Sequence, residues 1–248
     1  MQNSIYGVFN GSGAAEQYVG PAASLPGAAA MSAGILARVA DFDPANAISF
    51  GNLSGVPAGW RIRLVAVAAG ENTTGNVIQA VIQTNARIHT VPIGATLMEW
   101  VFVSFAKSGT TVTVYVNGEA VYADTDAGNV VTPQAGAPVL TIPGFSKGVV
   151  SAAFYTEQAL SADQMSLLGL FARDFPFVGA TLDHLYSAPA SLRPTAGSLP
   201  FADTGSVGGL PLTPPNNPNA MRTAVSPAYF GQAIVADTAG VVPGPVSA

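Results

Sequence analysis

The segment Trp100–Asp126, WVFVSFAKSGTTVTVYVNGEAVYADTD, decides the fold class of this chain. It contains two runs rich in β-branched and aromatic residues, Trp100–Ala106 and Thr111–Val116, on either side of a Lys-Ser-Gly-Thr turn. An Asn-Gly pair at 117–118 then leads into a third run, Glu119–Ala123. Asn-Gly is a strong hairpin signal, because a type I′ turn needs a positive φ at both central residues. The segment therefore predicts a three-stranded antiparallel meander.

The middle run alternates between apolar and polar residues. Val112, Val114 and Val116 fall on one side of an extended chain, and Thr111, Thr113 and Tyr115 fall on the other. An antiparallel sheet with one apolar face is usually covered by a second sheet. We therefore expect an all-β fold, an antiparallel two-sheet jelly-roll sandwich.

Strand-sized runs separated by turn residues recur along the rest of the chain. A weak strand is expected at Ile5–Phe9, and Met31–Ala40 could be a helix or a strand. Turn residues on both sides of Met31–Ala40 favour the strand. Such spacing is typical of a sandwich or jelly roll. The remaining expected strands are Ile48–Phe50, Trp60–Ala68, Asn76–Thr84, Ala86–Val91, Leu97–Phe105, Val139–Ile142 and Gly148–Tyr155.

One short helix is expected after these strands. Ser161 and Gln164 form a capping box, in which the serine hydroxyl accepts from the Gln164 N–H and the glutamine side chain accepts from the Ser161 N–H. Apolar residues follow at helical spacing. The sequence predicts a helix at about 162–173.

Two motifs resemble a known family. A tryptophan that opens an apolar strand, a Lys-Ser-Gly turn and Val-Tyr-Val-Asn-Gly-Glu are similar to the central hairpin of laminin-G-like domains of the concanavalin A-like lectin/glucanase superfamily. Downstream, Phe154-Tyr155, Gln158–Ser161 and Met165–Leu168 resemble the closing strand and short helix of those domains. The family often places His after the tryptophan, where Val101-Phe102 stands here. The resemblance implies the sandwich fold and does not transfer a binding site.

Proline and glycine divide the chain into three parts. Residues 1–30 are rich in Gly, Ala and Ser and are expected to be an extended N-terminal arm, and 31–178 the concanavalin A-like β-sandwich. Residues 179–248 are expected to be a Pro/Gly-rich extended C-terminal tail with little regular structure. The tail has more large apolar residues than a plain linker, so we expect it to lie along a surface, its own or a neighbour's.

The bulk composition excludes several classes of partner. Charged residues make up 9% of the chain against 49% apolar, and the net charge is −5. Nine basic residues scattered along the sequence argue against nucleic-acid binding. There is no cysteine for a disulfide or a thiolate zinc site. The N-terminus has no standard secretory signal, and no apolar run reaches the length of a membrane span. A soluble protein is expected.

The sequence offers no catalytic, cofactor-binding or metal residue that we assign. The glutamates are isolated and do not form the Glu-x-Asp-x-Glu pattern of the superfamily's hydrolases; they are Glu16, Glu71, Glu99, Glu119 and Glu157. His89 is interpreted as a polar strand position and His184 as a helix-exit or loop residue. Asp124, Asp126 and Asn129, and separately Asp41 and Asp43, are the acidic groups closest to a calcium-loop composition, but turn roles explain them more simply.

Trp60 and Trp100 are the candidates for sugar stacking, although a tryptophan at the start of a sandwich strand is more often a core residue. We therefore assign no sugar site from the sequence.

Three functions compete. The first is a non-enzymatic structural protein whose arms contact neighbouring subunits in a large assembly. Its composition and arms resemble those of tailed-bacteriophage virion proteins, such as capsid decoration or tail-associated proteins, so the expected location is a virion. The partners would be other protein subunits, in a homo-oligomer or with capsid or tail proteins, and no cofactor is expected. The second is a carbohydrate-binding adhesin module, which would bind glycans. The third, a glycoside hydrolase, is disfavoured because no paired acids are present.

Overall fold

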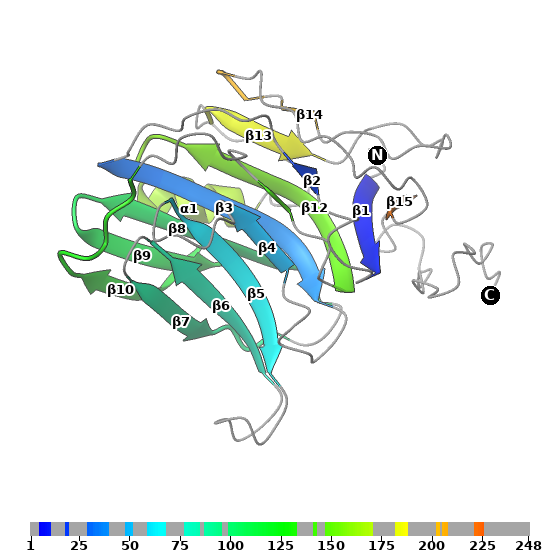
Figure 1. Ribbon diagram of the computed structural model, residues 1–248, viewed down its shortest axis with the longest axis horizontal. Coiled ribbons are helices and arrows are strands. Elements are labelled where there is room, and N and C mark those ends of the chain that lie inside the picture. Colours follow the sequence, from blue (N-terminus) through cyan, green and yellow to red (C-terminus); the bar gives the residue numbers. More distant parts are fainter. Residues whose placement is uncertain are drawn as a thin grey trace.

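The computed structural model forms two antiparallel sheets and one helix (Figure 1). The residues that it describes are 5–10, 18–19, 29–39, 48–51, 59–67, 77–84, 87–95, 99–132, 141–142, 147–170, 182–187, 202–203, 205–207 and 221–225. The all-β expectation with two antiparallel sheets and a single helix is confirmed for this part of the chain.

The larger sheet has nine strands, in the order β10-β9-β8-β3-β12-β1-β15, with β13 also pairing β12 and β14 pairing β13. Its strands are β1 (Ile5–Asn10), β3 (Ala30–Val39), β8 (Val101–Ser108), β9 (Thr111–Val116), β10 (Glu119–Thr125), β12 (Lys147–Thr156), β13 (His184–Ser187), β14 (Ala202–Asp203) and β15 (Met221–Val225).

The smaller sheet has six strands in the order β2-β11-β4-β5-β6-β7. They are β2 (Tyr18–Val19), β4 (Ile48–Gly51), β5 (Arg61–Val67), β6 (Val77–Gln83), β7 (Ile88–Pro92) and β11 (Thr141–Ile142). The expected order of strands along the chain is reproduced, and the ambiguous segment Met31–Ala40 is a strand, β3, as the flanking turns predicted.

The central meander forms as predicted. Residues of β8 pair with β9 from Val103↔Val116 to Ser108↔Thr111, and β9 pairs with β10 through the Asn117-Gly118 turn. Asn117 and Gly118 have φ of 51° and 89°, the positive values that a type I′ turn needs.

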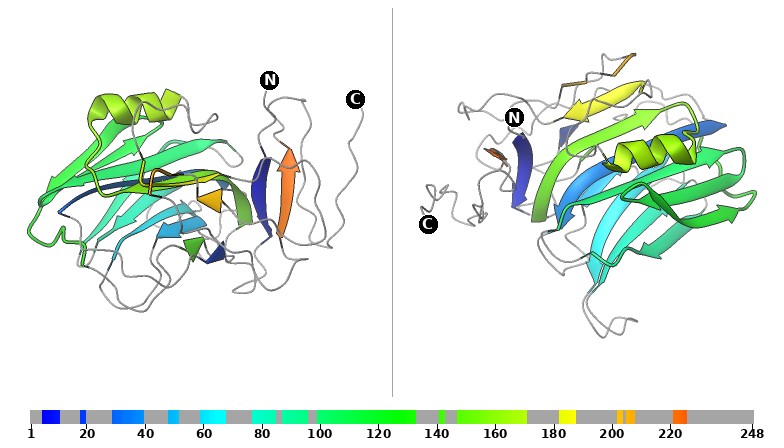
Figure 2. Two further views of the ribbon diagram at one scale, coloured as in Figure 1. Left: turned by 90° about the horizontal axis from the view of Figure 1, so that it is seen from above. Right: turned by 180° about the vertical axis from the view of Figure 1, so that it is seen from behind.

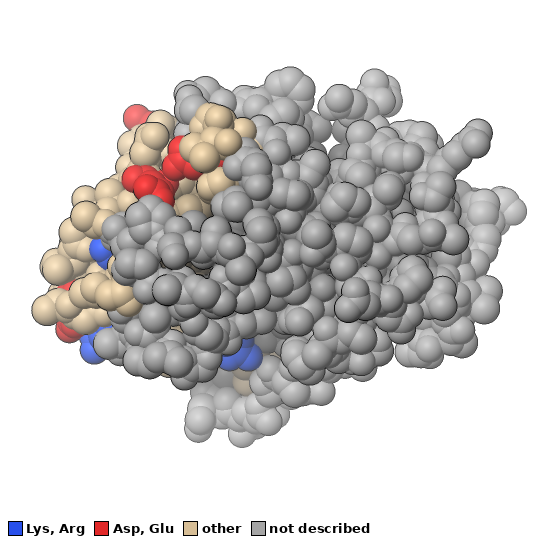
Figure 3. Space-filling model, turned by 45° about the horizontal axis from the view of Figure 1, so that its top comes forward, with Lys and Arg blue, Asp and Glu red and all other residues tan. Residues whose placement is uncertain are grey.

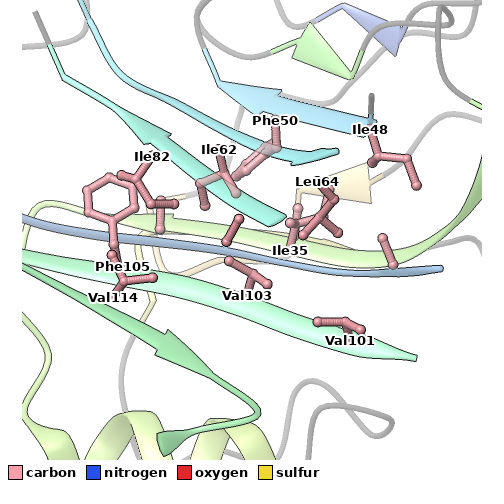
Figure 4. Packing of buried hydrophobic residues seen from close by; sticks show 14 of the residues in the cluster. Ile35, Ile48, Phe50, Ile62, Leu64, Ile82, Val101, Val103, Phe105 and Val114 are labelled. Carbon is pink, nitrogen blue, oxygen red and sulfur yellow. The ribbon is translucent and has the colours of Figure 1, made fainter. Parts of the chain in front are cut away.

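The main core lies between the two sheets. Inward side chains of β3, β8 and β9 on one sheet meet inward side chains of β4, β5 and β6 on the other (Figure 4). Ile62, Leu64 and Ala66 point into this core and Arg61 and Arg63 point away from it, which is the alternation that the sequence predicts for β5.

The helix α1 (Ala162–Leu170) covers the opposite face of the nine-stranded sheet (Figure 2). Its buried residues Met165 and Leu168 pack in a second cluster with Phe102, Tyr115 and Phe154. The capping box forms: the Ser161 N–H donates to Gln164 Oε1 at 2.9 Å, and the Gln164 N–H donates to Ser161 Oγ at 3.3 Å. The expected residues 171–173 of the helix lie outside the described part.

Both sheets extend into the segments expected to be arms. From 1–30, β1 pairs with β12 and with β15, and β2 pairs with β11. Little regular structure was expected in 179–248, and there β13 pairs with β12. The boundaries at 30/31 and 178/179 stay predictions. The helix of the described part does not have the length and apolar character that a membrane crossing requires.

Candidate functional site

The edge strands β7 and β10 meet at one end of the sandwich and are joined by a polar network. Buried His89 of β7 shares a 2.8 Å hydrogen bond between its Nε2 and Asn129 Oδ1. The Asn129 amide donates to Asp124 Oδ2 at 3.0 Å and to the Thr110 carbonyl at 3.0 Å. The ring of His89 also lies 5.6 Å from the ring of Tyr122. His89 is therefore an inward strand residue that closes this edge.

Arg87 lies between the two aspartates of this edge and pairs with both of them. Arg87 Nη2 lies 3.3 Å from Asp126 Oδ2 and 3.9 Å from Asp124 Oδ2. Asp126 also accepts from the Gly128 N–H at 2.7 Å, as a turn-forming aspartate does. Within the described residues no group of three or more His, Asp or Glu could hold a metal. Asp41 and Asp43 lie outside the described residues.

Trp60 belongs to the core. It is 3% exposed and stacks on Tyr155 at 5.6 Å, with Phe50 and Phe105 against it edge-on. Trp100 is half-buried on the helix side of the nine-stranded sheet, with the Arg38 guanidinium 4.2 Å above its ring. Neither tryptophan is an open stacking platform for a sugar.

His184 lies in a strand, β13, rather than at the helix exit or in a loop as the sequence suggested. The sequence missed β13 because the run His184–Ser187 is too short to show a period. The imidazole is buried and stacks on Tyr155, with the ring centroids 5.8 Å apart. Its pairing with β12 through Tyr155↔His184 fixes that position.

Carboxylates beside this stack are engaged in local hydrogen bonds. Asp183 Oδ2 accepts from the Thr156 hydroxyl at 2.9 Å and from the Glu157 N–H at 2.7 Å. Tyr155 donates to Glu157 Oε1 at 3.3 Å. Burial, and then the negative charges of Glu157 and Asp183, raise the pKa of Tyr155 far above its ordinary value. The arrangement locks the end of β12 to β13.

The outward face of the six-stranded sheet carries a different set of side chains. Arg61 and Arg63 lie on β5 on the side away from the core, opposite Gly51 and Ser49 of β4. On their other side they pair with Gln83 and Val81 of β6. We call Arg61, Arg63, Gln83 and Ser49 the arginine patch.

The two guanidinium groups of the arginine patch are half-buried and lack a carboxylate partner in the described part of the chain. The carboxylates Asp124 and Asp126 form their salt bridges with Arg87. Burial lowers the pKa of Arg61, which the charge of Arg63 lowers further, and burial also lowers the pKa of Arg63. Arg61 Nη2 donates to Gln83 Oε1 at 2.5 Å. The patch thus concentrates unneutralised positive charge that is partly shielded from water.

The other described residues of β5, β6 and β7 that share the face of the arginine patch are uncharged. Farther along β5 the same face holds the buried Val65 and Val67 against Val81. Beyond Gln83, the edge strand β7 presents Ile88, which is 64% exposed, and Thr90. The coloured part of the surface in Figure 3 shows acidic side chains close together near the top and basic side chains at a few separate places. Attraction to the patch would therefore not be cancelled by neighbouring described charges.

The sequence analysis treated the nine basic residues as scattered and did not single out Arg61 and Arg63. Positions two apart on a strand share a face, so these two arginines lie together on the strand. The signal was present: two of only nine basic residues fall in one alternating strand. What the sequence could not supply was Gln83, which reaches Arg61 only through the β5–β6 register.

No protein family model matches the chain, and no curated protein sequence matches it significantly. Solved structures do resemble it. A "putative carbohydrate binding protein" from Bacteroides ovatus ATCC 8483 has a TM-score of 0.62 at 14% identity, over 100% of this chain and 62% of that one. This chain thus spans less than two thirds of the Bacteroides chain.

Two further structures are similar at lower scores. A native heptameric SAP-like pentraxin from Limulus polyphemus has a TM-score of 0.49 at 16% identity, over 67% of this chain and 82% of that one. Domain 4 of AbnA, a GH43 extracellular arabinanase from Geobacillus stearothermophilus, has a TM-score of 0.39 at 17% identity, over 59% and 71%. At these identities the likeness bears on the fold alone, and the chain is an antiparallel two-sheet β-sandwich.

Proposed function

We propose that the protein is a non-catalytic carbohydrate-binding module that takes its ligand at the arginine patch. The observation that carries the proposal is the patch itself: two guanidinium groups on the outer face of a sheet, one of them hydrogen-bonded to the Gln83 amide, next to exposed Ile88 and Thr90. Sugars are bound by such fixed polar groups beside apolar surface. The lectin-like fold supports the proposal by analogy only.

The described carboxylates support a non-catalytic role. Asp124 and Asp126 are paired with Arg87, and Asp183 is held by Thr156 and the backbone of Glu157. A glycosidase needs one carboxyl group free to protonate the leaving oxygen and a second to act on the sugar. Carboxylates committed to neighbouring groups are poorly suited to either step.

A glycan array tests the proposal. We expect the full-length protein to bind a defined set of glycans and the Arg61→Gln/Arg63→Gln double variant to lose that binding. Arg38→Gln serves as the matched control, because it removes the same charge from the other sheet. If no glycan is retained, or the double variant binds as the native chain does, the arginine patch is not a carbohydrate site.

A role as a subunit of a large assembly, including a phage virion, is the second candidate. It is favoured by the 9% charged composition and by the exposed edge strand β10, where Val121 is 46% exposed. An exposed strand edge offers unpaired backbone groups to another chain. The molecular mass in solution tests this: the assembly role predicts a concentration-dependent oligomer that Val121→Lys weakens, and a monomer at all concentrations argues against it.

A further inference from the structure

We infer that the saccharide bound at the arginine patch is acidic, bearing carboxylate or sulfate groups that Arg61 and Arg63 neutralise. This inference rests on the proposed carbohydrate-binding function and specifies the chemistry of the ligand.

The first step is the geometry of the pair. Arg61 and Arg63 are separated by one inward residue, Ile62, so their Cα atoms lie about 7 Å apart along one face of β5. Both neighbouring strands are hydrogen-bonded to β5 over this stretch. Two cations on a rigid central strand are held at a fixed spacing, as recognition of an anion requires.

The second step is the missing counter-charge. Across the strand pairs, Arg61 faces Gly51 and Gln83, and Arg63 faces Ser49 and Val81. None of these four residues is acidic, and Asp124 and Asp126 form salt bridges with Arg87 instead. Like charges placed together and partly removed from water repel each other, which is unfavourable unless an anion joins them. An acidic ligand relieves this repulsion, whereas a neutral sugar does not.

The third step is orientation. The 2.5 Å hydrogen bond from Arg61 Nη2 to Gln83 Oε1 fixes the plane of the guanidinium. Arg61 Nε is buried with no hydrogen-bond partner, so the group has an unused donor. A planar fork of donors matches the paired oxygens of a carboxylate or sulfate. Gln83 is accordingly a positioning residue for Arg61.

The experiment is isothermal titration calorimetry of the full-length chain with three probes: tetragalacturonic acid, its fully methyl-esterified form, and a chondroitin sulfate tetrasaccharide. The first two share one sugar backbone and differ in whether each carboxyl group is charged or methyl-esterified. The third carries sulfates in addition to carboxylates, so binding of the third but not of the first would indicate that sulfate is the preferred anion. We expect at least one acidic probe to bind and the methyl ester to bind at least about 10-fold more weakly. Raising the salt concentration should weaken binding of the acidic probe.

Variants connect the effect to the patch. Arg61→Gln and Arg63→Gln should each weaken binding of the acidic probe about 10-fold or more, since each removes a charge-assisted hydrogen bond. Arg61→Lys should restore part of the loss, because it keeps the charge without the fork. Arg38→Gln should bind as the native chain does, and thermal unfolding of every variant should confirm that it is folded.

The outcomes separate this inference from the proposed function. If the ester and the acid bind equally and the arginine variants are unaffected, the acidic-ligand inference is overturned, while carbohydrate binding elsewhere survives. If inorganic sulfate alone displaces the acidic probe at equal concentration, the patch is a general anion site and the saccharide inference fails. If neither these probes nor the glycan array show binding, the proposed function fails and the inference fails with it.

Discussion

Single residues close the edge of the sandwich, and Asn129 is the most consequential of them. It is fully buried, its Oδ1 accepts a hydrogen bond from His89 Nε2, and its amide nitrogen donates to Asp124 and to the Thr110 carbonyl. Asn129→Ala removes the hydrogen-bond partner of the buried His89 Nε2, at a cost of about 1–3 kcal/mol for a group left unsatisfied. Asp124 keeps Arg87 and the Thr110 carbonyl keeps the Asp126 N–H, so we expect the free energy of unfolding, measured by urea denaturation, to fall by about 1–3 kcal/mol.

Thr125→Ala is the control for the Asn129 variant. Thr125 is exposed, on the neighbouring strand β10, and its hydroxyl bonds only to Thr111 among described side chains. Thr125→Ala should change the free energy of unfolding by about 0.5 kcal/mol or less. Equal small effects from both substitutions would mean that the network is not buried in solution.

Tyr155 makes the free energy of unfolding depend on pH in the alkaline range. Its pKa is raised by burial and by Glu157, so the folded state keeps the phenol protonated where the unfolded chain ionises at its ordinary pKa of 10.0. The corresponding stability is fully present below pH 10 and falls as the pH rises above it. We expect Tyr155→Phe to flatten this fall by up to about 1.4 kcal/mol per pH unit.

Urea denaturation of the native chain and of Tyr155→Phe between pH 9 and pH 11.5 measures this difference. Lys107, whose pKa is lowered by burial, contributes with the opposite sign, but it does so equally in both proteins. Parallel curves for the two proteins would contradict the assignment. Glu157→Gln should shrink the difference, because it removes one of the charges that raise the Tyr155 pKa.

At the scale of elements, helix α1 is seated on the Asn-Gly turn between β9 and β10. A Cβ added to Gly169 would lie 2.3 Å from the Asn117 carbonyl oxygen and 2.5 Å from Gly118 N. Ser166 also donates to the Gly118 carbonyl at 3.1 Å. The turn that builds the meander therefore also docks the helix, and the two elements depend on each other.

Gly169→Ala tests this contact, because the sign of the change in the free energy of unfolding shows whether the helix packs closely on the turn. In an exposed helix the substitution stabilises by about 1 kcal/mol, but here the new Cβ meets backbone atoms that cannot move aside. We expect the free energy of unfolding to fall by about 1–3 kcal/mol. Gly109→Ala is the control for added bulk, since its Cβ would meet nothing within 4 Å and only the positive φ of 57° opposes it. Stabilisation by Gly169→Ala would show that the helix does not sit on the turn.

At the scale of the whole molecule, the C-terminal segment is part of the body rather than only an appendage. Tyr186 of β13 is buried in the main core, and Leu182 and Leu185 are buried in the second cluster with α1. Burying a large apolar side chain contributes about 1.5–3 kcal/mol. Removing all residues after 178 therefore removes these three buried apolar side chains and the strands β13, β14 and β15.

We expect truncation after Val178 to lower the midpoint of urea denaturation strongly or to prevent folding, and truncation after Val207 to have a much smaller effect. Circular dichroism of both proteins alongside the full chain checks this. If the protein truncated after Val178 is as stable as the full chain, the contribution of β13 to stability is small.

The sequence by itself determined the β-sandwich. Local signals were sufficient for the Asn117-Gly118 turn, the alternation of Arg61–Val67 and the capping box of Ser161 and Gln164, because each depends on residues near one another in the chain. Turn geometry and strand period are local properties, so a pattern predicts them.

Only the tertiary structure decided which distant residues meet. Arg87 reached Asp124 and Asp126, Tyr186 entered the core, and Gln83 came to lie beside Arg61 through strand pairing across loops. Register between strands is set by the fit of whole faces, and no short pattern encodes it. The outward face of β5 could be predicted from sequence, but its conversion into a charged patch with an oriented arginine required the fold.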